Sequence, residues 1–369
     1  MKADVLTDNL KKGLSIAFRA ISTRSQLPVL LNFLLEAKNG FIYISATDLE
    51  IGITTKAPAK IEQEGATTVP AKTFLDLISS INEEKTTLSL SGSQLILSGK
   101  HLKTSFPTIS AEEFPKILNE KGKKIALIKT KEALGALSRV VFAASQDMGR
   151  PALSGVLMKR EGEGLILVAT DGYRLSLRKN FMPLFKEGDI EGLIVPSRIL
   201  RELVGFGEDS EEYDFYVSKE TNQVVFSTKD VVLVGRLIEA EYPDYKKILP
   251  EDFETKAVFD RSDAQNAVKA CSVFAREAAN IIRVAVGKNK VVFSSSASSV
   301  GENEIDVEAV VEGEENEIAF NSRYLLDFLS SIDDQEIDFR MMGPLNPGVF
   351  RSPKDKDYLH IIMPIRIQG

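Results

Sequence analysis

The sequence lacks any hydrophobic run approaching the roughly 20 apolar residues that a membrane-spanning helix requires. Its first ten residues include Asp4 and Asp8 and contain no apolar core, so no secretory signal peptide is expected. The single cysteine, Cys271, excludes an internal disulfide and favours a reducing environment. We therefore expect a cytoplasmic protein that does not associate with membranes.

Residues that commonly build catalytic or metal centres are also scarce. The two histidines, His101 and His360, have no cysteine or paired acid at metal-binding spacing, and the strand pattern around His360 favours a surface or edge position. No Walker A segment or glycine-rich dinucleotide turn is present. The main enzymatic alternative uses Asp48 and Asp171, but these are equivalent residues of two repeats, which favours turn capping. We expect no enzymatic activity, cofactor or metal.

Positive charge is in the minority. The chain has 46 Lys and Arg against 53 Asp and Glu, a net charge of −7, which argues against strong general binding to nucleic acid unless basic residues gather on one face. With 369 residues, 43% hydrophobic and 27% charged, the composition is typical of a globular protein of two or three domains.

The chain repeats itself three times. An apolar doublet, a break and a short helical pattern occur at 68–78, 194–204 and 319–329, so that Pro70, Pro196 and Asn321 lie 126 and 125 residues apart. The triplet Ala-Thr-Asp ends a strand pattern at 46–48 and again at 169–171, an offset of 123 residues. The agreement of these offsets predicts three domains, at 1–120, 121–250 and 251–369.

Each repeat follows the same order of helical and strand patterns. The first opens with apolar residues at helical spacing, which are Leu10, Leu14, Ala17, Phe18 and Ile21. Strand patterns flank Ser91-Gly92-Ser93, which predicts a hairpin, and Ser262 with Gln265 fits a capping box for the third repeat's first helix. We predict an α+β fold in which each domain packs two helices on seven or eight antiparallel strands.

Four motifs and the triplication together resemble one family. The motifs are Thr47–Glu50, Thr170–Leu175, Tyr242–Tyr245 and Met363–Ile367, and the chain resembles the beta subunit of bacterial DNA polymerase III, the sliding clamp, over essentially its whole length. The resemblance implies three tandem clamp domains that form a ring as a head-to-tail homodimer. Such a ring encircles duplex DNA without sequence specificity and serves as a processivity factor in DNA replication. The alternative is a repeat protein without a ring that acts only as a protein-interaction scaffold.

Basic residues outnumber acidic ones on the predicted helices. A positive lining would attract DNA phosphates without reading bases, whereas the alternative is an ordinary solvated helix face. By resemblance, Arg24 and Gln146 match DNA-contacting positions. The loop 149–152 lacks the aromatic residues of some clamps, which argues against stacking there but leaves Arg150 as a phosphate contact. The remaining candidates are Lys11, Lys12, Arg19, Lys72, Arg139, Arg198, Arg201 and Lys269.

The resemblance also implies a pocket for short linear motifs of replicative DNA polymerase, clamp-loader and repair proteins. Leu153, Leu175, Ile248 and Met363 would bury large client side chains, and Met adapts to several ligands. Arg174 and Asn321 would hydrogen-bond a client glutamine or backbone. The alternative interpretation of the apolar C-terminus is a buried last strand, which we favour for Ile361, Ile362 and Ile367. The pocket residues that match the family are Leu153, Thr170, Gly172, Tyr173, Arg174, Leu175, Pro243, Lys247, Ile248, Asn321, Tyr324, Pro347, Met363, Pro364, Ile365 and Arg366.

Overall fold

The computed structural model describes residues 1–22, 25–117, 121–147, 149–181, 184–185, 190, 192–205, 211–250 and 252–366. The chain forms two compact units. Unit 1 comprises Met1–Lys131, Leu184–Gly188 and Glu202–Leu237, and unit 2 comprises Glu132–Pro183, Asp189–Arg201 and Ile238–Gly369. In the part of the chain described, no helix is long and apolar enough to cross a membrane.

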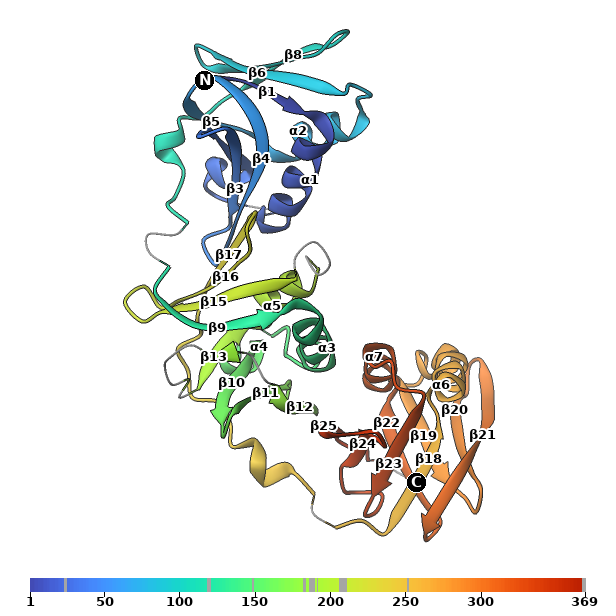
Figure 1. Ribbon diagram of the computed structural model, residues 1–369. Helices are drawn as coiled ribbons and strands as arrows, with labels where there is room; N and C mark the ends of the chain where they lie inside the picture. Colours follow the sequence, from blue (N-terminus) through green and yellow to red (C-terminus); the bar gives the residue numbers. More distant parts are fainter. Residues whose placement is uncertain are drawn as a thin grey trace. The chain divides into compact units, whose positions relative to one another are not determined.

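Unit 1 is built on a 13-stranded sheet whose main path runs β13-β9-β15-β16-β17-β4-β1-β6-β7-β8, with β2, β3 and β5 attached beside β4 (Figure 1). Its strands are β1 (Lys2–Leu6), β2 (Asn32–Lys38), β3 (Phe41–Thr47), β4 (Ile51–Gln63), β5 (Gly65–Pro70), β6 (Lys85–Ser91), β7 (Gln94–Ser98), β8 (Lys103–Pro107), β9 (Lys123–Lys129), β13 (Leu184–Phe185), β15 (Glu212–Ser218), β16 (Gln223–Ser227) and β17 (Val231–Arg236). The predicted hairpin at Ser91-Gly92-Ser93 is confirmed, because β6 and β7 pair around Gly92, whose φ of 59° suits glycine.

Two helices cover one side of this sheet. They are α1 (Thr7–Ala17) and α2 (Ala71–Ser80), which pack against each other while α1 also packs on β3 and β4. Leu10, Leu14 and Phe74 are fully buried on the inner faces. The first helix ends at Ala17, earlier than the apolar pattern predicted, and a 3-10 turn, η1 (Phe18–Ala20), follows it. Two more 3-10 turns are η2 (Pro28–Leu31) and η3 (Ala111–Glu113).

Unit 2 is built on a 12-stranded sheet in the order β14-β10-β11-β12-β25-β24-β23-β18-β21-β20-β19-β22. Its strands are β10 (Gly155–Glu161), β11 (Gly164–Thr170), β12 (Arg174–Phe181), β14 (Leu193–Pro196), β18 (Thr255–Asp260), β19 (Ile281–Val286), β20 (Lys290–Ala297), β21 (Gly301–Gly313), β22 (Asn316–Asn321), β23 (Glu336–Met341), β24 (Gly348–Ser352) and β25 (Asp355–Ile362). Its helices are α4 (Pro151–Ser154), α6 (Arg261–Ala275) and α7 (Ser322–Ser331), with the 3-10 turn η4 (Tyr245–Ile248). The helices α3 (Thr130–Val141) and α5 (Ser197–Gly205) contain positions at which the two units divide.

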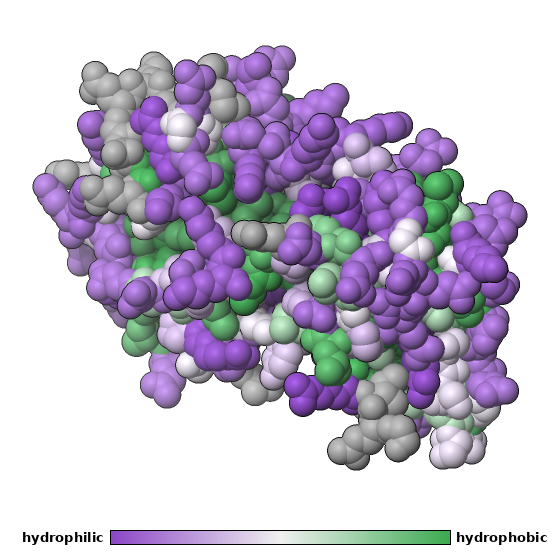
Figure 2. All heavy atoms as spheres, turned by 90° about the horizontal axis from the view of Figure 1, so that it is seen from below, coloured by the Kyte–Doolittle hydropathy of each residue, from purple (hydrophilic) through white to green (hydrophobic). Residues whose placement is uncertain are grey.

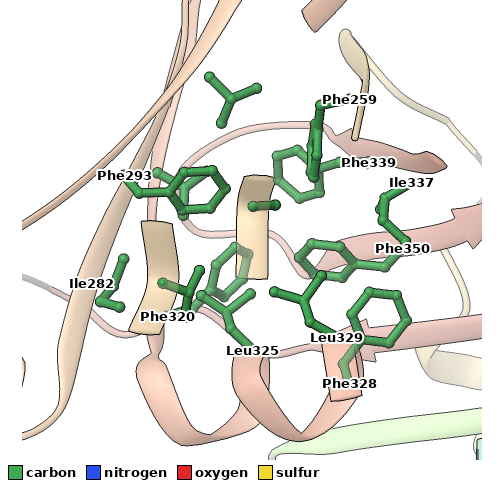
Figure 3. Close-up of a cluster of buried hydrophobic side chains, with 14 of the residues drawn as sticks. Phe259, Ile282, Phe293, Phe320, Leu325, Phe328, Leu329, Ile337, Phe339 and Phe350 are labelled. Carbon is green, nitrogen blue, oxygen red and sulfur yellow. The ribbon is translucent and has the colours of Figure 1, made fainter. Parts of the chain in front are cut away.

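The core of the third repeat lies between its two helices and its strands. Figure 3 shows Phe320, Phe328, Phe339 and Phe350 converging with Leu325 and Leu329 of α7. Phe339 and Phe350 stack with ring centroids 4.8 Å apart. Burying one such side chain contributes about 1.5–3 kcal/mol, so this cluster holds α7 on the strands.

The capping box predicted for α6 is wrong. The N-cap residue is Asp260, whose carboxylate accepts hydrogen bonds from the backbone N–H groups of Ser262 and Asp263. Asp260 ends β18 in extended conformation, and an aspartate there satisfies two free N–H groups and also favours the positive end of the helix dipole. A strand that runs directly into a helix therefore places the cap two residues earlier than the capping-box pattern indicated.

One strand pair in each unit joins consecutive repeats. In unit 1, β17 pairs with the first half of β4, from Val231 opposite Thr55 to Gly235 opposite Ile51. In unit 2, β25 pairs with β12, from Tyr358 opposite Arg178 to Ile362 opposite Arg174. In both pairs the last strand of one repeat lies antiparallel to the equivalent strand of the preceding repeat, over the same length. We call these pairs the first joint and the second joint.

Hydrophobic residues on the visible face of Figure 2 occur in separate patches among hydrophilic ones. Large apolar side chains that remain exposed include Tyr173, Ile248 and Met363 in the second repeat, the η4 segment and the C-terminal segment. These three belong to the set predicted to bind partner peptides, which directs attention to the second joint.

Candidate partner-binding and DNA-contacting sites

The turn between β11 and β12 is held by two side chains. Thr170 Oγ1 donates to the carbonyl of Arg174 (2.6 Å) and accepts from the N–H of Gly172 (3.0 Å). Asp171 Oδ1 accepts from the N–H groups of Tyr173 and Arg174. Gly172 has φ +92°, a left-handed conformation that glycine adopts without strain. The turn-capping role predicted for Asp171 is therefore confirmed, and the turn leaves the Tyr173 side chain 58% exposed.

Arg174 extends its guanidinium away from the turn into the body of unit 2. Its Nε donates to Asp171 (3.1 Å), its Nη1 to Asp327 of α7 (2.7 Å) and its Nη2 to the carbonyl of Phe142 (2.9 Å). The group also lies 4.6 Å from the ring centroid of Tyr324. Only 9% of the side chain is exposed. The two carboxylates and the carbonyl offset the desolvation cost of the buried guanidinium, which joins the segments that supply those groups.

The C-terminal segment runs beside this turn. The N–H of Met363 donates to the carbonyl of Tyr173 (2.8 Å), and the N–H of Ile365 donates to the carbonyl of Ala319 (2.8 Å). These bonds continue β25 beyond its last residue and place Met363, which is 37% exposed, next to Tyr173. At the start of α7, Asn321 Oδ1 caps the helix by accepting from the N–H of Arg323. Burial, followed by the nearby Asp171 charge, raises the pKa of the Tyr324 phenol.

The segment that links the second and third repeats packs on the outer face of the same strands. Tyr242 donates its hydroxyl proton to the carbonyl of Val168 (3.1 Å), and burial raises its pKa well above the ordinary value. Tyr245 is buried in a cluster with Leu175 and Ile361. Ile248 is 42% exposed, and Lys247 extends into solvent, where it pairs with Asp244. The anchored tyrosines thus fix a segment on which Pro243 and Ile248 remain exposed.

The predicted pocket residues differ in their contacts and in their exposure. The structure brings together Thr170 to Leu175, Asn321, Tyr324 and the 363–365 segment through the contacts above. Exposed apolar surface comes from Tyr173, Ile248 and Met363, whereas Leu175 is 1% exposed and Leu153 is 9% exposed, so both lie beneath the surface. Pro347, Pro364 and Ile365 are half-buried, and Pro243 and Arg366 are exposed. The donors of Arg174 and the Asn321 oxygen already have partners within the protein, which differs from the ligand contacts predicted for them.

Most of the predicted DNA-contacting residues are exposed. They are Lys11 and Lys12 on α1, Arg19 in η1, Lys72 on α2, Gln146 and Arg150 in the segment before α4, Arg198 and Arg201 on α5, and Lys269 on α6. Arg19 pairs with Glu202 (3.3 Å). Arg150 pairs with Asp147, and that contact, after a backbone hydrogen bond from Gly149, lowers the pKa of the Asp147 carboxyl. Arg24 lies outside the described residues.

Three protein-family models match the chain in order. They describe the DNA polymerase III beta subunit: its N-terminal domain at residues 1–118, its central domain at 127–244 and its C-terminal domain at 246–366. The chain belongs to the DNA polymerase III beta subunit family. The predicted resemblance and the three-domain clamp fold of helices and antiparallel sheets are thereby confirmed.

Individual relatives in this family extend over the whole chain. The beta sliding clamp of Staphylococcus epidermidis is 29% identical over 99% of each chain. The crystal structure of the DNA polymerase III beta subunit of Thermotoga maritima superposes with a TM-score of 0.90 at 30% identity, covering 100% of both chains. The DNA polymerase sliding clamp of Bacillus subtilis gives a TM-score of 0.91 at 25% identity, again over both whole chains. These relatives are sliding clamps, so a scaffold without DNA is not favoured.

Within this family fold, the charge of Arg139, a residue predicted to contact DNA, is paired inside the protein. Its guanidinium pairs with Asp334 (2.9 Å) and Asp355 (3.2 Å), lies 5.3 Å from the ring centroid of Tyr358, and its side chain is 18% exposed. These contacts join α3 to the third repeat. Arg201, although exposed as a residue, donates to the carbonyl of Val141 at the end of α3 (3.3 Å); partial burial of its guanidinium lowers its pKa, with a smaller contribution from the nearby Arg174. Cations at a helix C-terminus are stabilised by the helix dipole.

The surface or edge position predicted for His360 is wrong. The ring is fully buried, stacks on Phe328 with centroids 4.9 Å apart and forms a 2.6 Å hydrogen bond between Nδ1 and Ser176 Oγ. Burial lowers its pKa well below the ordinary value. Strand alternation identified two faces of β25 correctly, but Phe328 of α7 covers the face that carries His360.

Sequence reasoning missed three groups that shape the site. Asp327, Phe142 and His360 contact Arg174 or lie beneath the turn, yet none matches a recognised motif. The signal that was available is the repeat itself: residues 170–176 match residues 47–53 of the first repeat, and their polar differences from that segment mark the second joint.

Proposed function

We propose that two copies of this chain close a ring around duplex DNA and hold replicative DNA polymerase, clamp-loader and repair proteins through the surface around Tyr173 and Met363. The chain would act in the cytoplasm as a processivity factor with no chemistry of its own. We assign the three domains to residues 1–120, 121–250 and 251–369. The observation that supports ring closure best is that both joints use the same edges, which leaves one further matching pair of strand edges without a partner among the described residues.

The unused edges are those of β8 and β21. β8 is the last strand of the first repeat and lies at the edge of the sheet in unit 1. The equivalent last strands of the other repeats, β17 and β25, pair with β4 and β12 of the preceding repeat. β21 has the length of β4, and its second half pairs with β18 as the second half of β4 pairs with β1. In the described residues, the outer edge of its first half, Gly301–Ile305, has no strand partner, whereas the matching Ile51–Thr55 pairs with β17. A heterologous contact of this kind closes into a ring when the rotation per domain is right.

The repeat also predicts the register of this contact between copies. β7 and β8 pair as β16 and β17 do, so Phe106 corresponds to Gly235 and would lie opposite Gly301 of the second copy. Lys103 then lies opposite Glu304, and both residues are exposed in the single chain. The opposite charges complement each other across the strands. Unpaired edges that are covered on assembly also avoid indiscriminate strand addition.

A charge exchange tests this contact. Lys103→Glu and Glu304→Lys should each shift the protein toward monomer in sedimentation equilibrium, because each places like charges opposite one another. The double variant Lys103→Glu/Glu304→Lys should restore the dimer at low salt. Lys159→Glu, an exposed change on β10, is the matched control. A double variant as monomeric as the single ones would reject this register.

The DNA contact would be electrostatic. Lys11, Lys12, Lys72, Arg198 and Lys269 are exposed on the helices, and Gln146 and Arg150 are exposed in the segment between α3 and α4. Contacts from lysine and arginine to phosphates attract DNA without reading sequence, which permits sliding. Arg139 is not proposed as a contact because its charge is committed to Asp334 and Asp355.

Topology separates a clamp from its alternatives. The chain, loaded by a bacterial clamp loader with ATP, should remain on nicked circular DNA and dissociate from the same DNA once it is linearised. A scaffold without a ring would show no difference between the two substrates. A protein that only binds phosphates would be lost from both equally as salt increases.

Deleting Met363–Gly369 tests the partner surface separately. The deletion removes the side chain beside Tyr173 and should abolish binding of the polymerase while the protein remains dimeric. Unchanged polymerase affinity would place the partner surface elsewhere.

A further inference from the structure

Arg174 contacts several separate segments of the second joint. Its guanidinium bonds to Asp171 in the turn, to the Phe142 carbonyl beyond the end of α3 and to Asp327 on α7. Its backbone is held by Thr170 and Asp171 and pairs with Ile362 of β25. Three chain segments from two repeats therefore meet at the Arg174 side chain, which is 9% exposed, and a fourth, β25, pairs with its backbone.

The residues that Arg174 orients are those with available surface. The next residue back, Tyr173, exposes its ring and accepts the Met363 N–H through its carbonyl. Tyr324, whose ring lies against the guanidinium, is half-buried at the start of α7. A shift of the guanidinium would therefore move the turn relative to α7 and would separate Tyr173 and Met363 from Tyr324.

We propose that Arg174 is a positioning residue, which fixes the partner surface in its binding-competent form through Asp327 and does not itself bind the peptide. This inference rests on the proposed function, because it assumes that partners bind beside Tyr173 and Met363. The physical gain is preorganisation: a surface already held in its bound geometry loses less conformational entropy when a flexible peptide binds.

Asp327 is the point at which this arrangement can be weakened without emptying the core. Its side chain is 48% exposed, so Asp327→Asn removes the charge while an amide oxygen remains as an acceptor. We expect about fivefold weaker binding of a fluorescent ten-residue peptide that contains glutamine followed by leucine and phenylalanine. Asp327→Glu should recover affinity to within about twofold, since it restores the carboxylate. Asp263→Asn, which alters an exposed acid on α6, should bind as the unaltered protein does.

Arg174→Lys tests the arginine itself. Lysine keeps the charge but cannot span two carboxylates and a carbonyl with a planar fork, so we expect a larger loss, about 20-fold. The decisive comparison is the double variant Arg174→Lys/Asp327→Asn, which should bind as weakly as Arg174→Lys alone because Asp327 acts through Arg174. A general loss of structure would not produce this lack of additivity, and thermal unfolding of each variant checks the fold.

The outcomes separate the two proposals. If the unaltered protein does not bind the peptide, the partner surface is wrong and the positioning role falls with it. If the unaltered protein binds the peptide, and Asp327→Asn and Arg174→Lys bind it with the same affinity as the unaltered protein, the partner surface stands and the positioning role is overturned. Losses that add in the double variant would also overturn it, since Asp327 would then act independently of Arg174.

Discussion

The two joints share one backbone arrangement and differ in chemistry. In the first joint, Thr47 and Asp48 hold the turn with the same hydrogen bonds that Thr170 and Asp171 use in the second. The strands then pair in the same register, so Ile53 lies opposite Leu233 where Ser176 lies opposite His360. The shared residues build the turn, and the differing ones build the second joint's polar interior.

Replacing an apolar pair by a polar one has a physical cost. Buried polar and charged groups lose their hydration and stabilise the fold only when all partners are present. In the second joint Arg174 and Arg139 each have two carboxylate partners, and His360 has Ser176. The second joint should therefore be the more sensitive of the two to single substitutions and to pH, and this comparison generates the following predictions.

The largest effect should come from the aspartates of the two turns. Asp171→Ala should lower the free energy of unfolding by about 3 kcal/mol, because two N–H groups lose an acceptor and the buried Arg174 loses one of its carboxylates. Asp48→Ala should cost about 1 kcal/mol, since Ile51 stands where Arg174 does in the other turn. Urea unfolding followed by circular dichroism measures both. Equal losses would mean that the two turns are energetically alike.

The next effect concerns pH. Burial lowers the pKa of His360, so the unfolded chain binds a proton below about pH 6.5 that the folded chain does not bind. The neutral, buried His360 therefore contributes its full stability above pH 6.5, and the free energy of unfolding should fall by about 1.4 kcal/mol per pH unit as the pH decreases below that value. The double variant Ser176→Ile/His360→Leu copies the Ile53–Leu233 pair and should lose this dependence.

His101→Gln is the control for the pH experiment, because His101 is the exposed histidine. It should retain the full decrease in stability between pH 6.5 and pH 5. If the double variant still loses stability at the same rate as the unaltered chain, acid sensitivity resides outside the second joint.

Much of this comparison could be predicted from the sequence. The offset of 123 residues between Asp48 and Asp171 identified equivalent turns, and strand alternation with a three-residue break identified the β6–β7 hairpin. Turns and hairpins are determined by residues close together in the sequence, so local sequence patterns are enough to predict them. The order of helices and strands repeats for the same reason, because each domain must bury one face of its helices on its own strands.

The partners of the charged residues could not be predicted in the same way. Arg174 pairs with Asp327, 153 residues further along the chain, and Arg139 with Asp355, 216 residues away. A positive charge on a helix face is equally consistent with a phosphate contact and with an internal carboxylate, and only the tertiary arrangement decides between them. His360 illustrates the same limit, since alternation reveals two strand faces but not what covers each of them.

The smallest predicted effect isolates the turn backbone. Leu49 occupies the place of Gly172 with φ +79°, a conformation that costs a side-chain-bearing residue about 1–2 kcal/mol. Its side chain is 57% exposed, so Leu49→Gly loses little packing and should raise the free energy of unfolding by about 0.5 kcal/mol after the entropy of the unfolded glycine is subtracted. Leu49→Ala, which shortens the side chain but keeps the strained φ, should give no such gain. A stabilised alanine variant would show that exposure of the leucine, and not its backbone conformation, determines the stability of the first turn.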